Sequence, residues 1–354
     1  MDEVRDSVAV SVPFAAGVAA AAFFGISGFS TVTGSSSMGL CAILILYLAY
    51  PDARYQKILS GLLMVSLGIL CYSTSIVTGA PSLPFQGILQ ESLCWLKGSI
   101  SDLPFPHEST APLLEALLTG DRSSLSPATT AAFRGSGASH ILALSGLHLG
   151  MIYLIVSKVL SLLGNSRKAV AAGSLATIAV TGAYTLMTGA GPSITRAMLF
   201  ILVNEVSKQQ TSRKKKPSDA FWTALFIQLA IQPQVISTMG FQLSYLAVAG
   251  ITFIFPKLDS WYPEGGLHKI WSAAALAISC QLTTAPLVWL RFHTFPKYFL
   301  LTNLLAMPLT EGLMACAVAS VVLSGLGWTP LSLIRATDFF AEALQRLLET
   351  ISSM

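Results

Sequence analysis

Long apolar runs recur along the whole chain, and this feature most constrains what it can fold into. A helix needs about 20 apolar residues to cross the hydrocarbon core of a membrane. Candidate runs lie at 8–28, 37–50, 58–78, 138–163, 169–188, 192–207, 218–232, 234–255, 270–290 and 298–324. Charged residues make up 11% of the 354 residues, against about 25% in a soluble domain. The sequence therefore predicts an all-α, polytopic integral membrane helix bundle of about ten transmembrane helices with short amphipathic helices. It excludes a soluble enzyme, a secreted disulfide scaffold and a disordered regulator.

The positions of Lys and Arg predict the orientation of this bundle. With the N-terminus in the cytoplasm, the cytoplasmic loops hold Arg54, Lys57, Arg167, Lys168, Lys208, Arg213, Lys214, Lys215, Lys216, Lys257 and Lys269. The outer loops at 29–36, 189–191 and 233 hold none, and the exception among the short loops is Arg291 and Lys297, which this scheme places outside. Because cytoplasmic loops are enriched in basic residues, we expect a multi-pass protein of the inner (plasma) membrane with a cytoplasmic N-terminus.

The same pattern divides the chain into four segments. We expect N-terminal transmembrane helices over 1–78, an extracytoplasmic loop with short helices over 79–137, a transmembrane core over 138–324 and a C-terminal amphipathic helix over 325–354. Within the loop, Ser126 is an N-cap followed by Pro127, which predicts a short helix ending at Gly135. Apolar residues at helical spacing from Leu333 to Ile351 predict the amphipathic helix.

Polar side chains inside apolar spans are costly, so each is a candidate functional residue. The candidates for lining a substrate path are His140, Ser145, His148, Arg196, Gln242, Ser244 and Asn303. On one continuous helix, Ser145 and His148 would share a face, about ten residues into the span and near mid-membrane. Three interpretations stay open for this pair: helix packing, a nucleophile pair, or the lining of a polar path. No acid or GxSxG motif accompanies the serine, so we expect no catalytic residue and no enzyme activity.

The remaining intramembrane groups also have more than one interpretation. Arg196 follows a Gly-rich turn, and it either extends to the outer interface or faces the bundle interior, where it can meet a phosphate. The amides Gln242 and Asn303 either join helices or line a pore. Glu311 lies near mid-depth of the last span and needs a partner or a proton, and its role is open.

A basic run follows one of the central spans. It contains Lys208, Arg213, Lys214, Lys215 and Lys216 and no acid. The run either fixes the topology and contacts anionic lipid, or receives a nucleic-acid strand or an acidic partner. The chain has no phosphate-binding glycine loop, and its five cysteines form no CxxC pair. We therefore expect no cofactor, no metal site and no motor within this chain.

Several ordered motifs resemble those of one family. Thr119-Gly-Asp-Arg122 precedes Phe133-Arg-Gly-Ser-Gly-Ala-Ser-His-Ile-Leu-Ala-Leu-Ser-Gly-Leu-His148. Later blocks are Thr188-Gly-Ala-Gly-Pro-Ser-Ile-Thr-Arg-Ala197, Pro217-Ser-Asp219, Gln232-Pro, Gly240-Phe-Gln-Leu-Ser-Tyr-Leu-Ala247, Thr284-Ala-Pro286 and Thr302-Asn-Leu-Leu-Ala-Met-Pro308. Over residues 110–310 the chain resembles the competence domain of ComEC-type DNA uptake proteins.

This resemblance implies an inner-membrane channel that conducts single-stranded DNA into the cytoplasm during natural competence. Longer members carry an OB-like domain and a metallo-β-lactamase-like domain, and we expect neither here, because residues 79–110 are few and no HxHxDH pattern occurs. Arg122, Arg134 and the basic run are candidates for contacting DNA or a partner, and Tyr245 for stacking on bases.

The expected partners are single-stranded DNA, membrane lipids and a separate DNA receptor, nuclease and cytosolic motor. Whether one copy or a homo-oligomer encloses the path stays open. So do two alternatives, a small-solute or lipid-related transporter and a membrane scaffold.

Overall fold

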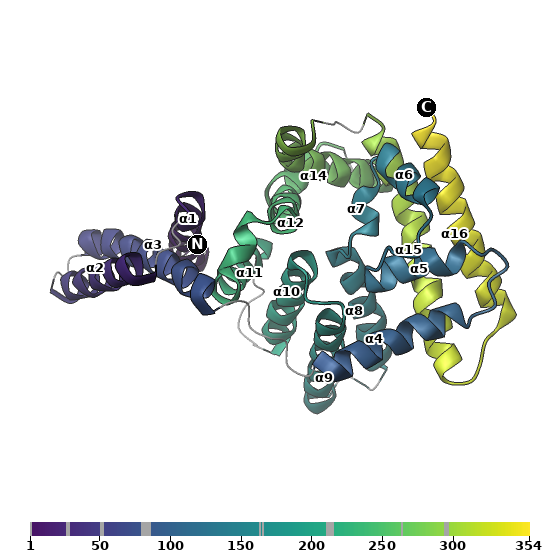
Figure 1. Ribbon diagram of the computed structural model, residues 1–354, viewed down its shortest axis with the longest axis horizontal. Coiled ribbons are helices and arrows are strands. Elements are labelled where there is room, and N and C mark those ends of the chain that lie inside the picture. The colour runs from purple at the N-terminus through teal and green to yellow at the C-terminus, as the bar shows by residue number, and fades with distance from the viewer. Residues whose placement is uncertain are drawn as a thin grey trace. The chain divides into compact units, whose positions relative to one another are not determined.

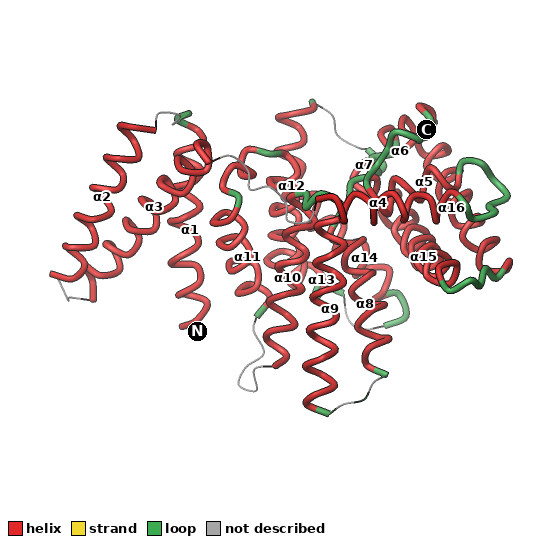
Figure 2. Tube along the Cα trace, turned by 60° about the horizontal axis from the view of Figure 1, so that its bottom comes forward, coloured by secondary structure: helices red, strands yellow, loops and turns green. Residues whose placement is uncertain are grey.

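The computed structural model describes residues 2–25, 29–49, 53–78, 86–162, 164, 166–209, 216–262, 265–293 and 297–354. These residues form helices joined by short connections, and no strand occurs among them (Figure 2). The helices, labelled in Figure 1, are α1 (Asp2–Phe23), α2 (Phe29–Ala49), α3 (Ala53–Thr78), α4 (Gln86–Ser101), α5 (Thr110–Thr119), α6 (Pro127–Gly135), α7 (Ser139–Leu142), α8 (Gly146–Ser161), α9 (Arg167–Met187), α10 (Pro192–Gln209), α11 (Pro217–Ile231), η1 (Pro233–Ser237), α12 (Met239–Ala249), η2 (Gly250–Ile254), α13 (Phe255–Asp259), α14 (His268–Phe292), α15 (Phe299–Gly325) and α16 (Leu331–Ser352).

Several of these helices have the length and apolar composition of membrane spans. Five segments of the described chain are long and apolar enough to cross a bilayer: Tyr55–Ile76, Arg167–Met187, Met239–Asp259, His268–Phe292 and Phe299–Gly325. Shorter apolar helices lie at Ser7–Phe23, Ser37–Tyr47, Thr110–Thr119 and Gly146–Ser161. The prediction of an all-α membrane helix bundle is confirmed, whereas the number of crossings and the inside–outside orientation stay predictions.

The chain divides into two compact units. One comprises residues 1–83 and 199–252, and the other comprises residues 84–198 and 253–354. In the first unit, α1 packs directly on α3 because both helices present glycine at the contact. A Cβ added to Gly17 would lie 2.1 Å from the carbonyl oxygen of Val65, and one added to Gly68 would lie 2.3 Å from that of Phe14. Small residues allow this close backbone approach in membrane helices.

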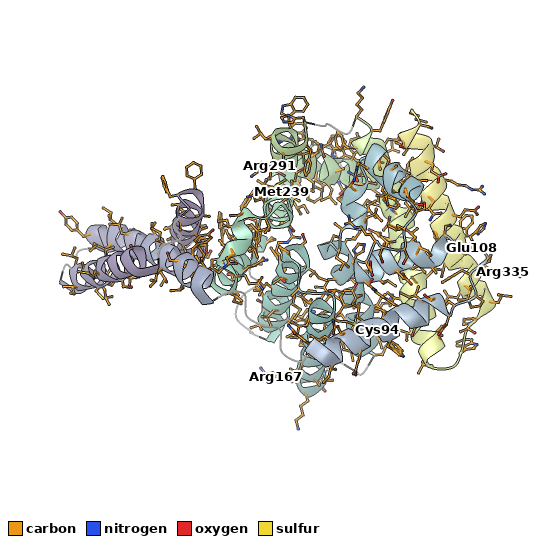
Figure 3. All side chains as sticks on the ribbon, viewed as in Figure 1. Cys94, Glu108, Arg167, Met239, Arg291 and Arg335 are labelled. Carbon is orange, nitrogen blue, oxygen red and sulfur yellow. The ribbon has the colours of Figure 1, made fainter. Side chains whose placement is uncertain are left out.

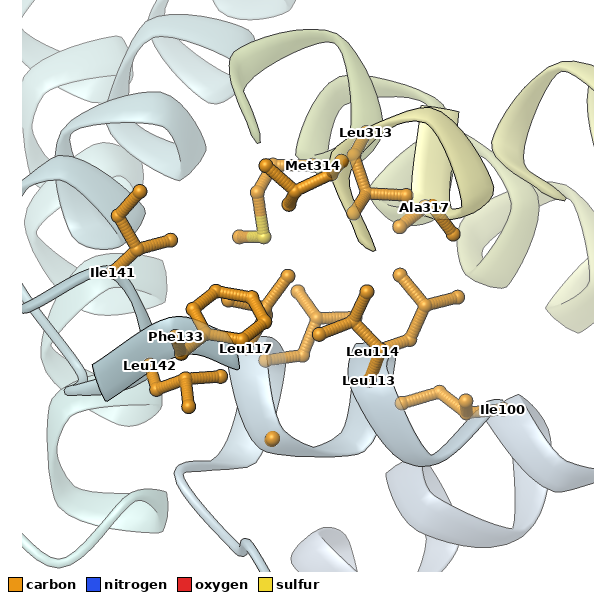
Figure 4. Packing of buried hydrophobic residues seen from close by; sticks show 14 of the residues in the cluster. Ile100, Leu113, Leu114, Leu117, Phe133, Ile141, Leu142, Leu313, Met314 and Ala317 are labelled. Carbon is orange, nitrogen blue, oxygen red and sulfur yellow. The ribbon is translucent and has the colours of Figure 1, made fainter. Parts of the chain in front are cut away.

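The second unit is organised around one large apolar core. Leu113, Leu114 and Leu117 of α5 face Leu313, Met314 and Ala317 of α15, with Phe133, Ile141 and Leu142 alongside (Figure 4). The buried face of α16, with Ile334, Ala341, Leu344 and Leu348, belongs to the same core. The helices α4–α6, in the segment expected as an outer loop, therefore pack together with the last two helices of the chain.

Two helix predictions for this unit are confirmed. The helix expected after Ser126 is α6, and the Ser126 side chain accepts a hydrogen bond from the N–H of Thr129 at 3.0 Å. The expected C-terminal amphipathic helix is α16, whose apolar face packs on α15 and α6. The exposed Cys94 lies on α4 (Figure 3).

A polar clamp joins α16 to the connection before α5. The Asp338 carboxylate accepts hydrogen bonds from the backbone N–H of His107 (3.2 Å), from its ring Nδ1–H (2.7 Å) and from the hydroxyl of Thr110 (2.6 Å). The hydrogen bond and negative charge of Asp338, aided by Glu342, raise the pKa of His107. Burial alone would raise the pKa of Asp338, but the hydrogen bonds from Thr110 and His107 outweigh it and lower that pKa.

Candidate functional site

The apolar run at 138–163 is not one continuous helix. It begins with the single turn α7, which ends at Leu142, and the backbone is extended at Ala143 (φ −78°, ψ 132°) and again at Ser145 (φ −116°, ψ 167°). The longer helix α8 then starts at Gly146. The expectation that Ser145 and His148 share the face of one long helix is therefore wrong. His148 is the third residue of α8 rather than the tenth of a span.

Ser145 and His148 cap the start of α8 reciprocally. The Ser145 hydroxyl accepts a hydrogen bond from the N–H of Leu147 at 3.2 Å. The N–H of Ser145 itself donates to Nδ1 of His148 at 3.2 Å. This is a capping box in which histidine takes the place usually held by Glu or Gln. The cap explains the break, because Ser145 must leave the helical conformation to form these two hydrogen bonds.

The cap also fixes the chemistry of the His148 ring. Since Nδ1 accepts a hydrogen bond, the neutral imidazole carries its proton on Nε2. His148 is 0% exposed, and Nε2 has no hydrogen-bond partner among the residues that the structure describes. His148 and Ser145 thus lack the bond from hydroxyl to imidazole that a nucleophile pair requires. What His148 presents instead is a buried N–H donor.

Arg196 brings a positive charge to the same helix start. It lies in the second turn of α10, after a connection in which Gly189 (φ 84°) and Ala190 (φ 49°) both adopt positive φ. Its side chain is only 8% exposed, so it packs against protein and does not extend to an open interface. Nη2 lies 3.1 Å from the position that a Cβ on Gly146 would occupy. The absence of a side chain at Gly146 therefore lets the guanidinium reach α8.

A second polar pair lies at α7. His140 is exposed, its Nδ1 lies 3.2 Å from the carbonyl oxygen of Gly137, and its ring interacts with the side chain of Asn303 on α15. Asn303 Oδ1 is buried and has no hydrogen-bond partner in the described part of the chain. Thr302, next to it, donates to the carbonyl oxygen of Ser136 at 2.8 Å. These contacts hold α7 against the start of α15.

The other path candidates lie in the first unit. The Gln242 amide on α12 donates to the carbonyl oxygen of Ile236, in the preceding short helix η1, at 2.8 Å, and Ser244 is half-buried on α12. Tyr245 is buried among Phe221 and Phe241, and its hydroxyl donates to Gln228 at 2.9 Å. The ring of Tyr245 is thus part of the core, and its expected role in stacking on bases finds no support.

The basic candidates separate into several roles. Arg122 Nε donates to the carbonyl oxygen of Leu142 at 3.2 Å and so supports the end of α7, whereas Arg134 is exposed on α6. Lys208 forms an ion pair with Glu205 at 2.6 Å. Lys216 is exposed at the start of α11, and Arg213, Lys214 and Lys215 lie outside the described residues. The acidic Glu311, whose role the sequence left open, is exposed on α15.

Sequence reasoning missed two positioning groups. Gly146 matters through the side chain that it lacks, and only a structure reveals the neighbour that takes the space. The hydroxyl of Tyr184 donates to the carbonyl oxygen of Leu118 at 2.5 Å and joins α9 to α5. In the described part of the chain, no group of three His, Cys, Asp or Glu side chains could hold a metal ion.

Comparison with known proteins places the chain in a family. ComE operon protein 3 of Bacillus subtilis (strain 168) is 26% identical over 229 residues, which cover 64% of this chain and 28% of that protein. The chain thus matches less than a third of this relative's length, and no solved structure matches it. The family model described as "Competence protein" matches residues 117–354, more than half of the chain and all of α6–α16. The chain belongs to the Competence protein family.

Proposed function

We propose that this chain forms an inner-membrane channel that conducts single-stranded DNA into the cytoplasm during natural competence. Membership of the Competence protein family and the composition of the helices support this proposal. The observation that carries it furthest is the buried position of Arg196 against the start of α8. A charged side chain buried in a membrane bundle is costly and marks a path for ions or substrate.

The charge of this group fits a nucleic-acid strand. A single strand carries one negative phosphate per nucleotide, and proteins that bind it without sequence preference follow the backbone with basic groups. The exposed Arg134 and Lys216 offer further basic groups outside the apolar core. A channel for a neutral solute gains nothing from a buried guanidinium.

The energy for transport comes, in this proposal, from other proteins. The sequence contains no phosphate-binding glycine loop, so a cytosolic motor pulls the strand, while a separate receptor and nuclease deliver it. The basic run from Lys208 to Lys216 faces the cytoplasm and receives the emerging strand or the motor. The chain itself performs no catalysis, and a homo-oligomer provides the wall of the path if one copy is too narrow.

Deletion of the gene tests this function directly. Transformation frequency with linear DNA is measured in the wild type, in the deletion strain and in the strain complemented with the wild-type chain. We expect internalised DNA to fall to background in the deletion strain while labelled DNA still binds at the cell surface. Unchanged transformation without the gene would remove the proposal and leave the transporter or the scaffold as the function.

A further inference from the structure

We infer that the start of α8 binds a phosphodiester group of the DNA backbone, through the Nε2–H of His148 and the guanidinium of Arg196. This inference rests on the proposed function and adds to it the chemical group that is recognised and the two side chains that recognise it. The capping box holds His148 in the first turn of α8, and the space at Gly146 lets Arg196 of α10 approach the same turn.

The chemistry of the groups at this point selects an anion. His148 presents a donor, because its only acceptor nitrogen is already bonded to the N–H of Ser145. Arg196 has five N–H donors and no acceptor, which lets it serve more than one acceptor at once. The amino-terminal end of α8 adds the positive end of a helix dipole. Each of these groups favours a bound negative charge, as the groups of known anion sites at helix starts do.

The two segments that carry His148 and Arg196 contain no carboxylate. No Asp or Glu occurs between Asp121 and Glu205, a stretch that contains α6–α9 and the first turns of α10. The helix α14, whose Cys280 lies near Arg196, has none either, and Glu311 of α15 is exposed. Among the described residues the buried Nε2–H has no acceptor, and in this inference the ligand supplies it.

The site is closed in the state that the structure describes. His148 is fully buried, whereas Ser145 and Gly146 beside it are partly exposed. The chain is non-helical from Ala143 to Ser145, so this short connection can shift without breaking a helix. A phosphodiester that approaches Ser145 and Gly146 meets the guanidinium first. It then gives the buried Nε2–H the acceptor that it lacks.

Strand binding by the purified full chain tests this inference. The chain is reconstituted in neutral phosphatidylcholine nanodiscs, and fluorescence anisotropy reports the binding of labelled oligo(dT) over a range of salt concentrations. A second oligo(dT) with uncharged methylphosphonate linkages is the matched probe. We expect the wild-type chain to prefer the phosphodiester strand, and the logarithm of its affinity to fall linearly with the logarithm of the salt concentration.

The variants separate the two roles. Arg196→Gln should weaken binding and reduce the salt slope by about 0.7, the value for one lost phosphate contact on a single strand. Arg196→Lys should keep the slope and lose only part of the affinity, because ammonium retains the charge without the planar fork. His148→Phe should weaken binding about tenfold, equivalent to about 1.4 kcal/mol, without changing the slope, since the imidazole is neutral. Gly150→Ala is the control, because an added Cβ at Gly150, one turn further along α8, meets no atom within 4 Å, and it should leave affinity and slope unchanged.

Several results would overturn the inference. It falls if the methylphosphonate strand binds as tightly as the phosphodiester strand, or if Arg196→Gln keeps the wild-type slope. It also falls if the variants leave strand binding intact but release co-purified phosphatidylglycerol, because the phosphodiester recognised would then be a lipid headgroup. If His148→Phe does not fold, the slopes of the two Arg196 variants still decide. Loss of transformation on deletion together with unaltered strand binding by the variants would leave the proposed function standing without this site.

Discussion

Gly146 offers a test that separates folding from DNA uptake. A methyl group on this residue would lie 3.1 Å from Nη2 of Arg196 and 3.3 Å from the Cβ of Ala197, whereas ordinary contacts begin at 3.4 Å. The neighbours must therefore move by 0.3 Å and 0.1 Å, and the guanidinium is the end of a flexible side chain. Replacing Gly by Ala also gains about 0.5–1 kcal/mol within a helix. Gly146→Ala should thus change the free energy of unfolding by no more than about 1 kcal/mol.

The effect on uptake should grow with the size of the side chain. Gly146→Ala displaces the guanidinium slightly, and we expect transformation to fall a few-fold. Gly146→Val, whose branched side chain extends further towards the guanidinium, should reduce transformation at least tenfold, about 1.4 kcal/mol in the step that Arg196 assists. The matched controls are Gly150→Ala and Gly150→Val, one turn further along α8, where an added Cβ meets no atom within 4 Å.

The assay is transformation frequency divided by the abundance of each variant in the membrane. Thermal unfolding of the purified variants supplies the stability comparison. Equal transformation by Gly146→Val and Gly150→Val at equal abundance would show that the position of the guanidinium is irrelevant to uptake. A loss of uptake that only follows a loss of abundance would lead to the same conclusion.

Three further predictions concern packing, pH and topology. Gly68→Ala should destabilise the α1–α3 contact by about 1–3 kcal/mol, because its Cβ would lie 2.3 Å from a carbonyl oxygen. The control Gly61→Ala, whose added Cβ meets nothing within 4 Å, should leave the melting temperature unchanged or higher. Asp338→Asn should lower the melting temperature most below pH about 6.5, the ordinary pKa of histidine. The difference in melting temperature from wild type should shrink as the pH rises through the raised pKa of His107. A difference that is constant from pH 5 to 9 would contradict the clamp. In intact cells whose other cysteines are replaced, a membrane-impermeant thiol reagent should label the exposed Cys94 and not Ser212→Cys, and the reverse labelling would invert the predicted orientation.

The helices were predictable because the membrane leaves few choices. Each long apolar run must satisfy its backbone internally, so an apolar run of that length predicts a helix without any knowledge of its neighbours. Local chemistry likewise predicted α6, because Ser126 followed by proline is a strong start signal wherever it occurs.

The geometry of the candidate site was harder to predict from the sequence. The break before α8 depends on the choice of Ser145 between a helical position and a cap, and both are compatible with its apolar surroundings. The length of the apolar run over 138–163 favoured one continuous helix, and the cap at Ser145 was therefore not predicted. The approach of Arg196 to Gly146 joins residues 50 positions apart, and neither residue carries a local signal for it. Periodicity identified an apolar face on α16, but it could not show that Leu344 shares a core with Leu113 of α5.

The distance along the chain between the two halves of that core governs when it can form. Leu113 and its neighbours on α5 pack on Leu313 and its neighbours on α15, so synthesis must add some 200 residues before the first can meet the second. At about 5–20 residues per second this interval lasts roughly 10–40 s. During that time the apolar face of α5 lacks its native partner, and non-local contacts of this kind are slow to form. We expect the membrane insertion machinery or the lipid surface to shelter α4–α6 until α15 and α16 arrive. The assembly of this protein should therefore be sensitive to anything that delays translation of these two helices.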